Sequence, residues 1–153
     1  MVPKIDIDRA TVRIGSSYPA AFQAAVQGRE KRALGTLAGL TQFGVNITRL
    51  KPGAASSQRH WHEKEDEFVY VLEGELVLID DAGETLLRPG DVAGFKAGEP
   101  NGHHLVNKSS RDAVYLEIGT RATVDRVHYP DIDLVNEKDV RGGRFQHKSG
   151  ESY

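Results

Sequence analysis

The sequence predicts an all-β fold, an antiparallel sandwich or barrel made of short strands. Its apolar residues recur at every second position in several runs, and a period of two is typical of a half-buried strand. Short segments rich in Gly, Pro and Asp separate these runs, as expected for turns between neighbouring strands. Many short strands joined in this way are typical of sandwiches and barrels. The clearest runs are QFGVNITRL, EFVYVLEGELVLID and AVYLEIGTR, which start at Gln42, Glu67 and Ala113.

The composition predicts one globular domain. The chain has 153 residues, a common size for a single core, with 39% hydrophobic and 27% charged residues. Its net charge of −2 argues against a nucleic-acid partner, because such a partner requires a basic face. No apolar run is long enough for a membrane span and no apolar signal core is present, so we expect no membrane partner and a cytoplasmic location. The sequence has no Cys, and any bound metal must therefore use His, Glu, Asp and water.

The N-terminal quarter of the chain is expected to form an arm, one short helix and a connector. In residues 1–18 apolar side chains alternate, which favours an extended arm that pairs with a sheet edge or a second subunit, or else a loosely held terminus. Residues 18–28 are rich in Ala, with Pro19 suited to a first helical turn and Gly28 suited to a helix end. Residues 29–40 mix charges with Gly and predict an irregular connector.

From residue 41 onward the expected strands follow one another closely. The first, over residues 42–50, ends at a Pro-Gly pair. The strand that begins at Glu67 reaches Glu73-Gly74, where a tight turn into a hairpin is the simplest interpretation. After residue 123 the chain becomes polar, with too few apolar residues for a second core, and we expect a strand and loops that pack on the barrel or on a partner. Further strands are expected at residues 84–87, 92–95, 103–107 and 113–121.

Two histidines and a glutamate between residues 53 and 74 indicate a candidate metal site. Because successive side chains of a strand point to opposite faces, His60 and His62 share one face. Glu67 follows a short acidic break and starts the next run of strand-forming residues. Two imidazoles and a carboxylate can then converge from neighbouring strands, and these ligands suit Zn, Fe, Mn, Ni or Cu. An HxH pair by itself is more often a surface feature of a polar strand, so the assignment depends on the rest of the spacing.

The spacing of Gly, His and Glu in this segment closely resembles the first sequence motif of the cupin superfamily. Six residues separate Gly53 from His60, and one residue separates His60 from His62. Four residues then precede Glu67, and six more precede Gly74.

Residues 89–107 resemble the second cupin motif. They begin with Pro-Gly-Asp and continue through Gly98 to His103 and Asn107, which keep the His-x-x-x-Asn spacing. There are two departures from the family pattern: Lys96 stands where the family usually has Pro, and the gap between Gly98 and His103 is longer than usual.

The resemblance implies a double-stranded β-helix, the jelly-roll barrel of the cupins, with its core over residues 41–121. Residues 1–40 would supply the arm and the short helix, and residues 122–153 would pack on the barrel or on a partner. The resemblance also implies a metal site. It does not imply a reaction, because cupins include dioxygenases, isomerases, lyases, storage proteins and sensor domains.

The fourth metal ligand is a choice between two adjacent histidines. Cupin spacing selects His103, which also shares the face of Asn107 in a regular strand. His104 would then point the other way. An alignment anchored on Pro100 leaves either histidine possible if the strand bulges.

The resulting hypothesis is one divalent ion, Fe, Mn, Zn or Ni, held by His60, His62, Glu67 and His103. Four protein ligands leave one or two positions open for a small-molecule ligand, water or O2. Glu67 is also the catalytic candidate, as a ligand in one state and a base in another. Other candidates for substrate contact are Arg49, Arg59, Tyr115 and Glu117.

Two classes of function remain open. In the first, the protein is a small metal-dependent enzyme, an oxygenase, isomerase or lyase, that acts on a small polar metabolite. In the second, it is a module that binds or senses a small ligand without turnover. The intact ligand spacing favours the enzyme, because a pure binding module does not need these histidines.

Strand alternation also predicts an apolar outer surface. If Glu67 faces the interior, then Phe68, Tyr70 and Leu72 face outward. Two aromatic rings and a leucine make an apolar row, so we expect a cover from the N-terminal segment or from a second copy. The family resemblance favours a homodimer.

Overall fold

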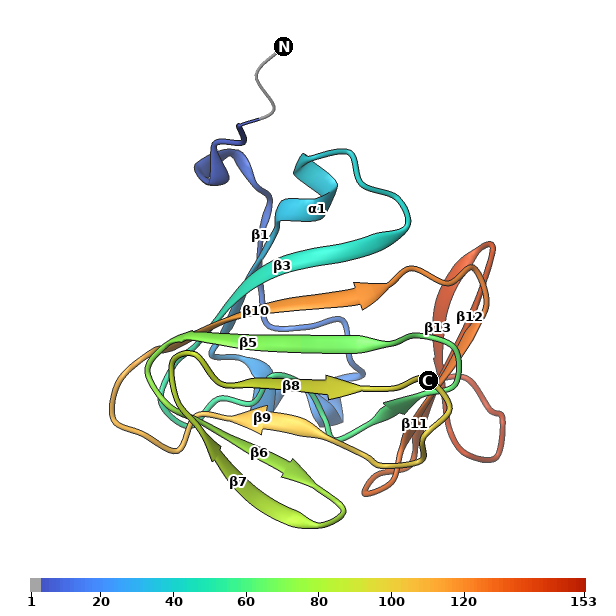
Figure 1. The fold of residues 1–153 in the computed structure, drawn as a ribbon. Coiled ribbons are helices and arrows are strands. Elements are labelled where there is room, and N and C mark those ends of the chain that lie inside the picture. The colour runs from blue at the N-terminus through green and yellow to red at the C-terminus, as the bar shows by residue number, and fades with distance from the viewer. Residues whose placement is uncertain (1–3) are drawn as a thin grey trace.

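The computed structural model describes residues 4–153, and strands dominate it (Figure 1). No helix among these residues is long and apolar enough to cross a membrane. The strands are β1 (Val12–Ile14), β2 (Arg29–Ala33), β3 (Phe43–Leu50), β4 (Trp61–His62), β5 (Glu67–Glu73), β6 (Leu76–Asp80), β7 (Gly83–Leu87), β8 (Val92–Phe95), β9 (His104–Val106), β10 (Ala113–Thr120), β11 (Asp125–Tyr129), β12 (Leu134–Asp139) and β13 (Gly142–Gln146). The helical elements are the 3-10 turns η1 (Ile7–Arg9), η2 (Ala20–Phe22) and η3 (Ala24–Val26), and the short helix α1 (Leu34–Leu37).

The strands form three antiparallel sheets, which confirm the predicted all-β jelly-roll fold. A six-stranded sheet has the order β1-β2-β3-β10-β5-β8, and a three-stranded sheet has the order β7-β6-β9. The main core lies between these two sheets, where side chains of β3, β5 and β10 meet those of β6, β7 and β9. Its largest fully buried members are Tyr115, Leu50 and Leu76. The third sheet, β13-β12-β11-β4, lies at one end of the barrel (Figure 1).

The hairpin predicted at Glu73-Gly74 is wrong. β5 pairs with β10 and β8, whereas β6 pairs with β7 and β9, so the chain crosses between the two sheets here. Gly74 has a φ of 72°, and a Cβ at this position would lie 2.6 Å from the carbonyl oxygen of Asp112. The position therefore requires glycine. The requirement comes from a crossover at which another strand approaches closely, and not from a hairpin turn.

The single helix predicted over residues 18–28 is also wrong, because the segment forms the two 3-10 turns η2 and η3. The stretch between Pro19 and Gly28 is too short for a stable α-helix without strong tertiary support. Its buried residue is Val26, which packs against the C-terminal sheet.

The irregular connector predicted over residues 29–40 is in fact strand β2 followed by α1. β2 was hidden because neither of its faces is apolar: Lys31 pairs with a carboxylate inside the barrel, and Arg32 lies 3.7 Å from Glu30 on the other face. The N-terminal arm pairs with β2 through β1 at the edge of the six-stranded sheet, which was one of its predicted alternatives.

The segment after residue 123 forms three strands, and β11 pairs with β4, which carries His62. A second hydrophobic cluster lies on this sheet. The tail does not build the cluster alone, because the N-terminal segment supplies two of its five buried members. The five buried members are Tyr18 and Val26 from the N-terminal segment and Val127, Tyr129 and Leu134 from the tail.

The outer face of the six-stranded sheet is apolar and open to solvent. Phe68, Tyr70 and Leu72 on β5 are 39%, 39% and 40% exposed, as the alternation predicts. Leu116 on β10 and Val92 on β8 flank Tyr70 on this face. Within residues 4–153 the N-terminal arm does not cover the row, because β2, β3 and β10 separate β1 from β5.

Candidate metal centre

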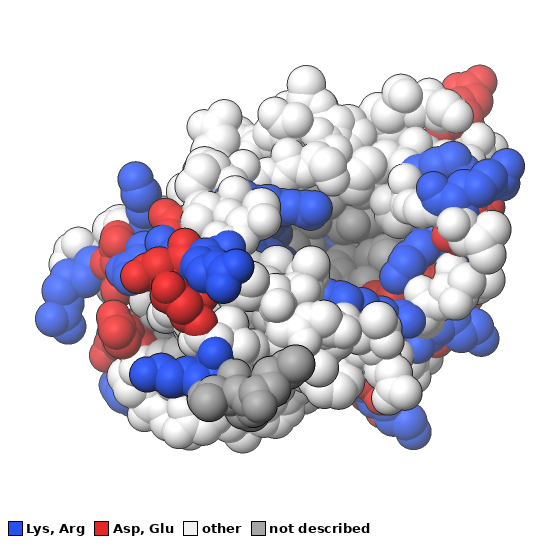
Figure 2. Space-filling model, turned by 90° about the horizontal axis from the view of Figure 1, so that it is seen from above, with Lys and Arg blue, Asp and Glu red and all other residues white. Residues whose placement is uncertain are grey.

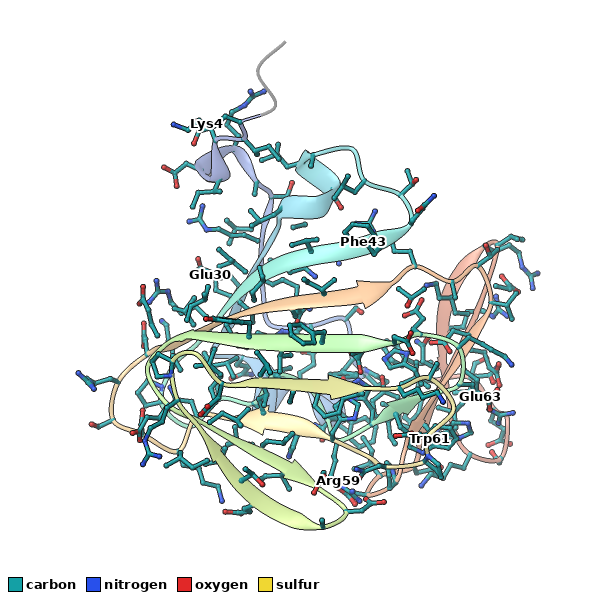
Figure 3. All side chains as sticks on the ribbon, in the orientation of Figure 1. Lys4, Glu30, Phe43, Arg59, Trp61 and Glu63 are labelled. Atoms are coloured by element: carbon teal, nitrogen blue, oxygen red, sulfur yellow. The ribbon has the colours of Figure 1, made fainter. Side chains whose placement is uncertain are left out.

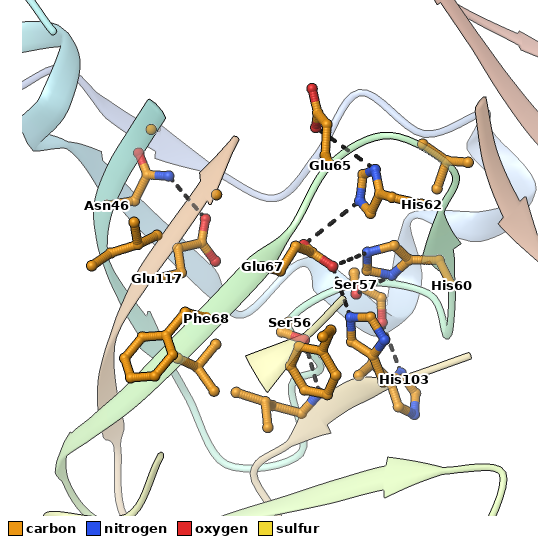
Figure 4. A pocket seen from close by; sticks show the side chains of 18 of the residues that line it. Asn46, Ser56, Ser57, His60, His62, Glu65, Glu67, Phe68, His103 and Glu117 are labelled. Atoms are coloured by element: carbon orange, nitrogen blue, oxygen red, sulfur yellow. Dashed lines mark hydrogen bonds and ion pairs between the residues drawn. The ribbon is translucent and has the colours of Figure 1, made fainter. Parts of the chain in front are cut away.

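The side chains of His60, His62, Glu67 and His103 converge inside the barrel (Figure 4). His60 and His103 face each other across an isolated antiparallel bridge, while β4 and β5 carry the other two. The Nε2 atoms of His60 and His103 lie 3.4 and 2.7 Å from Glu67 Oε2, and that of His62 lies 3.6 Å from Oε1. The structure thus brings the four predicted ligands together around one carboxylate.

The far nitrogen of each imidazole is held by a hydrogen-bond acceptor. Nδ1 of His60 and of His103 donates to the main-chain carbonyl two residues earlier, at 2.9 and 3.2 Å. Nδ1 of His62 donates to Asp125 Oδ2 at 2.6 Å. Because carbonyl and carboxylate oxygens only accept, Nδ1 is the donor in these three contacts. Each Nε2 therefore faces Glu67 either as a metal ligand or as a second N–H donor, and that of His103 lies within hydrogen-bond distance of Glu67 Oε2.

Three imidazole Nε2 atoms that face one carboxylate require a positive charge between them and its oxygens. A metal ion meets this need, and so do protons on the Nε2 atoms. Burial by itself would raise the pKa of Glu67, but the facing imidazoles, His60 above all, hold it well below its usual value. Burial would lower the pKa of His62, but hydrogen bonds to Asp125 and Glu67 raise it to about 10. The donor set therefore fits a divalent cation, with the tautomers already fixed by outer partners.

The geometry favours His103 over His104 as the fourth ligand. Phe95 stacks on the His103 ring with centroids 3.5 Å apart, which holds Nε2 toward Glu67. His104 Nδ1 instead donates to the carbonyl of Ser57 at 2.9 Å. Among the described residues, the ion-pair contacts of Glu67 include His103 and not His104.

Asp125 is the residue at this site that the sequence did not predict. It is 2% exposed, and besides His62 it accepts a hydrogen bond from the Lys64 amide at 2.8 Å. Glu65 also lies near His62, but one of its oxygens accepts from Lys138 Nζ at 2.6 Å. No motif spacing marks Asp125, because it reaches the site through the pairing of β11 with β4.

A cavity of about 360 Å³ opens beside the four converging side chains. Gly44, Gly119 and Glu67 lie in register across β3, β10 and β5, so two of the three positions at this level carry no side chain. These glycines leave room next to the candidate metal position. Seen from above in Figure 2, the molecule is hollowed on one side, and Lys and Arg side chains lie along part of the rim of the hollow.

The next row into the barrel is polar. Asn46 and Glu117 lie in register on β3 and β10, and Asn46 Nδ2 donates to Glu117 Oε1 at 3.0 Å. Lys31 on β2 forms an ion pair with the same oxygen. Tyr115 OH donates to Glu117 Oε2 at 3.3 Å, and burial raises the pKa of this tyrosine well above its usual value. Arg121 lines the cavity as well.

Two of the four predicted substrate-contact residues lie elsewhere. Arg49 pairs with Asp112 at 3.5 Å and is exposed. Arg59 binds Asp81 and Asp131 and ties the β6–β7 turn to the β11–β12 turn, near the lower edge of the molecule in Figure 3. Tyr115 and Glu117 do line the cavity.

Comparisons with known proteins agree with this architecture. The family model described as the cupin domain matches residues 46–119. No curated protein matches the chain.

Among solved structures, a sugar phosphate isomerase of the cupin superfamily from Silicibacter pomeroyi is 48% identical over 99% of this chain and 96% of that chain, with a TM-score of 0.95. A putative sugar phosphate isomerase from Acidithiobacillus ferrooxidans is 28% identical over 82% of this chain and 80% of that one, with a TM-score of 0.75. The polyketide cyclase RemF from Streptomyces resistomycificus, at 22% identity over 78% of this chain and 80% of that one and a TM-score of 0.64, shares the fold. The chain belongs to the cupin superfamily.

Proposed function

We propose that the protein is a metal-dependent isomerase that acts on a small phosphorylated sugar. The main support is the meeting of three imidazole Nε2 atoms and Glu67 at the side of a cavity that also holds a separate carboxylate, Glu117. The similarity to the sugar phosphate isomerase from Silicibacter pomeroyi supports the substrate class.

In this proposal His60, His62, Glu67 and His103 hold one divalent ion, for which Fe, Mn, Zn and Ni are all suitable. When bound, such an ion acts as a Lewis acid that polarises a substrate carbonyl. Other side chains that line the cavity would bind the remaining groups of the substrate. Arg121 supplies positive charge for an anionic substrate, whereas the charge of Lys31 is offset by its ion pair with Glu117. The Asn46 amide can bind a sugar hydroxyl.

The reaction can be tested by hydrogen exchange. Protein loaded separately with each of the four metals is incubated in D2O with a panel of aldose and ketose phosphates and followed by proton NMR. We expect deuterium next to the carbonyl and the signals of the isomer for at least one phosphate, and neither with the unphosphorylated sugar or the metal-stripped protein.

Other outcomes separate the remaining classes. Oxygen uptake without exchange would replace the isomerase with an oxygenase. Tight binding of a sugar phosphate, with neither exchange nor oxygen uptake, would support a binding module.

We further propose that a second copy of the chain covers the outer face of the six-stranded sheet. Phe68, Tyr70 and Leu72 continue there into a face that β3 and β10 extend, and contiguous apolar faces of this kind mark contact sites. Further members of the face are Val45, Ile47, Leu116 and Ile118.

Replacing Tyr70 with glutamate is expected to dissociate this dimer. A carboxylate buried without a partner in an interface costs about 3 kcal/mol or more, which corresponds to at least a 100-fold weaker association. Sedimentation velocity should show a dimer for the unaltered protein and a monomer for Tyr70→Glu. Val140→Glu is the control, because Val140 is 83% exposed and lies after β12. A monomeric unaltered protein would contradict the proposal.

A further inference from the structure

Glu117 is a carboxylate of the cavity that the candidate metal centre does not use. On β10 it lies directly opposite Val69 of β5, so it is the diagonal neighbour of Glu67 on the same face of the sheet. Diagonal neighbours lie about 7–8 Å apart, with a somewhat shorter Cβ–Cβ distance. Glu117 therefore lines the same cavity as Glu67, while the ion-pair contacts of Glu67 among the described residues are with the three histidines.

The side chain of Glu117 is held in place by three neighbours. Asn46 and Lys31 both bind Oε1, and among residues 4–153 only the Tyr115 hydroxyl donates to Oε2, at 3.3 Å. In Figure 4, Asn46 and Glu117 lie beside each other on neighbouring strands, to one side of Glu67 and the histidines. With Oε1 fixed by an ammonium and an amide, Oε2 keeps a free lone pair in the cavity.

The other described carboxylates of the cavity are committed elsewhere. Glu67 faces three imidazoles, and Glu65 is engaged by Lys138 and by the amide of Ala122. Burial raises the pKa of Tyr115, so its hydroxyl is a neutral donor at physiological pH. Glu117 is therefore the described carboxylate of the cavity that has an oxygen available for a substrate proton, and a general base must lie within hydrogen-bond reach of that proton.

We propose that Glu117 transfers the proton during isomerisation, an inference that rests on the proposed function. The C–H bond next to the substrate carbonyl breaks, its proton goes to Glu117 Oε2, and its electron pair forms the C=C bond of an enediolate. The negative charge moves to the former carbonyl oxygen. A proton then passes from the substrate hydroxyl to that oxygen, and Glu117 returns its proton to the former carbonyl carbon. No co-reactant is consumed.

The test compares Glu117→Gln with Glu30→Gln, which removes a carboxylate from the opposite face of the same sheet, on strand β2, two strands from β10. Three quantities are measured: metal content by elemental analysis, binding of the exchanging sugar phosphate by calorimetry, and deuterium exchange. We expect Glu117→Gln to keep one metal per chain and to bind the sugar phosphate within about tenfold of normal. Its exchange should fall at least about 100-fold, while Glu30→Gln stays normal.

Glu117→Asp keeps the carboxylate on a shorter side chain and should recover part of the exchange. Exchange in Glu117→Gln within tenfold of normal would overturn the inference and leave the isomerase intact. Loss of metal together with exchange would also overturn it, because the role would then be structural. If the unaltered protein exchanges no sugar phosphate, the proposed function fails and the inference fails with it.

Discussion

Replacing His62 with alanine is expected to leave the protein folded but without its metal. The structure aims three imidazole Nε2 atoms at Glu67, and removal of one leaves two imidazoles and a carboxylate. The loss of an outer hydrogen-bond partner of a ligand weakens metal binding by about 10–100-fold, and the loss of a ligand itself should exceed this. The metal content should fall from about one ion per chain to a small fraction. Elemental analysis of protein purified without a metal-affinity tag measures it.

His103→Ala and His104→Ala form a matched pair for the same measurement. The two residues are adjacent, but His103 lies 2.7 Å from Glu67, whereas His104 donates to the Ser57 carbonyl. We expect His103→Ala to lose the metal as His62→Ala does, and His104→Ala to retain it. Retention in His103→Ala with loss in His104→Ala would reverse the assignment, and retention in all three variants would refute the site.

The convergence of these residues was predictable because it depends on local geometry and family spacing. Strand alternation places Glu67 inside and Phe68 outside, and the structure has both as expected. The HxH pair meets Glu67 from another sheet, because β4 pairs with β11 and not with β5. The fourth ligand was less certain, because a lengthened loop before His103 disturbs the count along the strand.

The errors share a different physical origin. β2 was missed because an apolar alternation marks strands that face a core, and Lys31 faces a polar cavity instead. The crossover at Gly74 was interpreted as a hairpin because both need a glycine with positive φ. Packing between the sheets decides whether β6 pairs with β5 or crosses to the other sheet. The local sequence around Gly74 does not contain that information.

Asp125 illustrates the same limit at the site itself. It lies outside both motifs, and its contact with His62 depends on the pairing of β11 with β4. Its burial at 2% exposure is explained by two hydrogen bonds, one from His62 Nδ1 and one from the Lys64 amide. The hydrogen bond from His62 Nδ1 holds its ring with Nε2 toward Glu67, so Asp125 acts as a positioning residue.

Replacing Asp125 with asparagine should weaken metal binding by about 10–100-fold without removing any ligand. A carboxylate accepts from both His62 and Lys64, whereas an amide has one acceptor oxygen and must turn its NH2 group toward one of these donors. Either the His62 ring turns or the strand end shifts, and the imidazole also loses the charge that raises its basicity. Competition with a chromogenic chelator measures the affinity.

The control for this variant is Asp133→Asn. Asp133 also accepts from a histidine Nδ1, that of His147, and from a lysine amide, that of Lys148, each at 2.8 Å. It lies in the turn before β12, and its histidine does not reach the cluster around Glu67. We expect Asp133→Asn to bind metal normally. Equal affinity in Asp125→Asn and the unaltered protein would show that the Nε2 direction of His62 is set by packing alone.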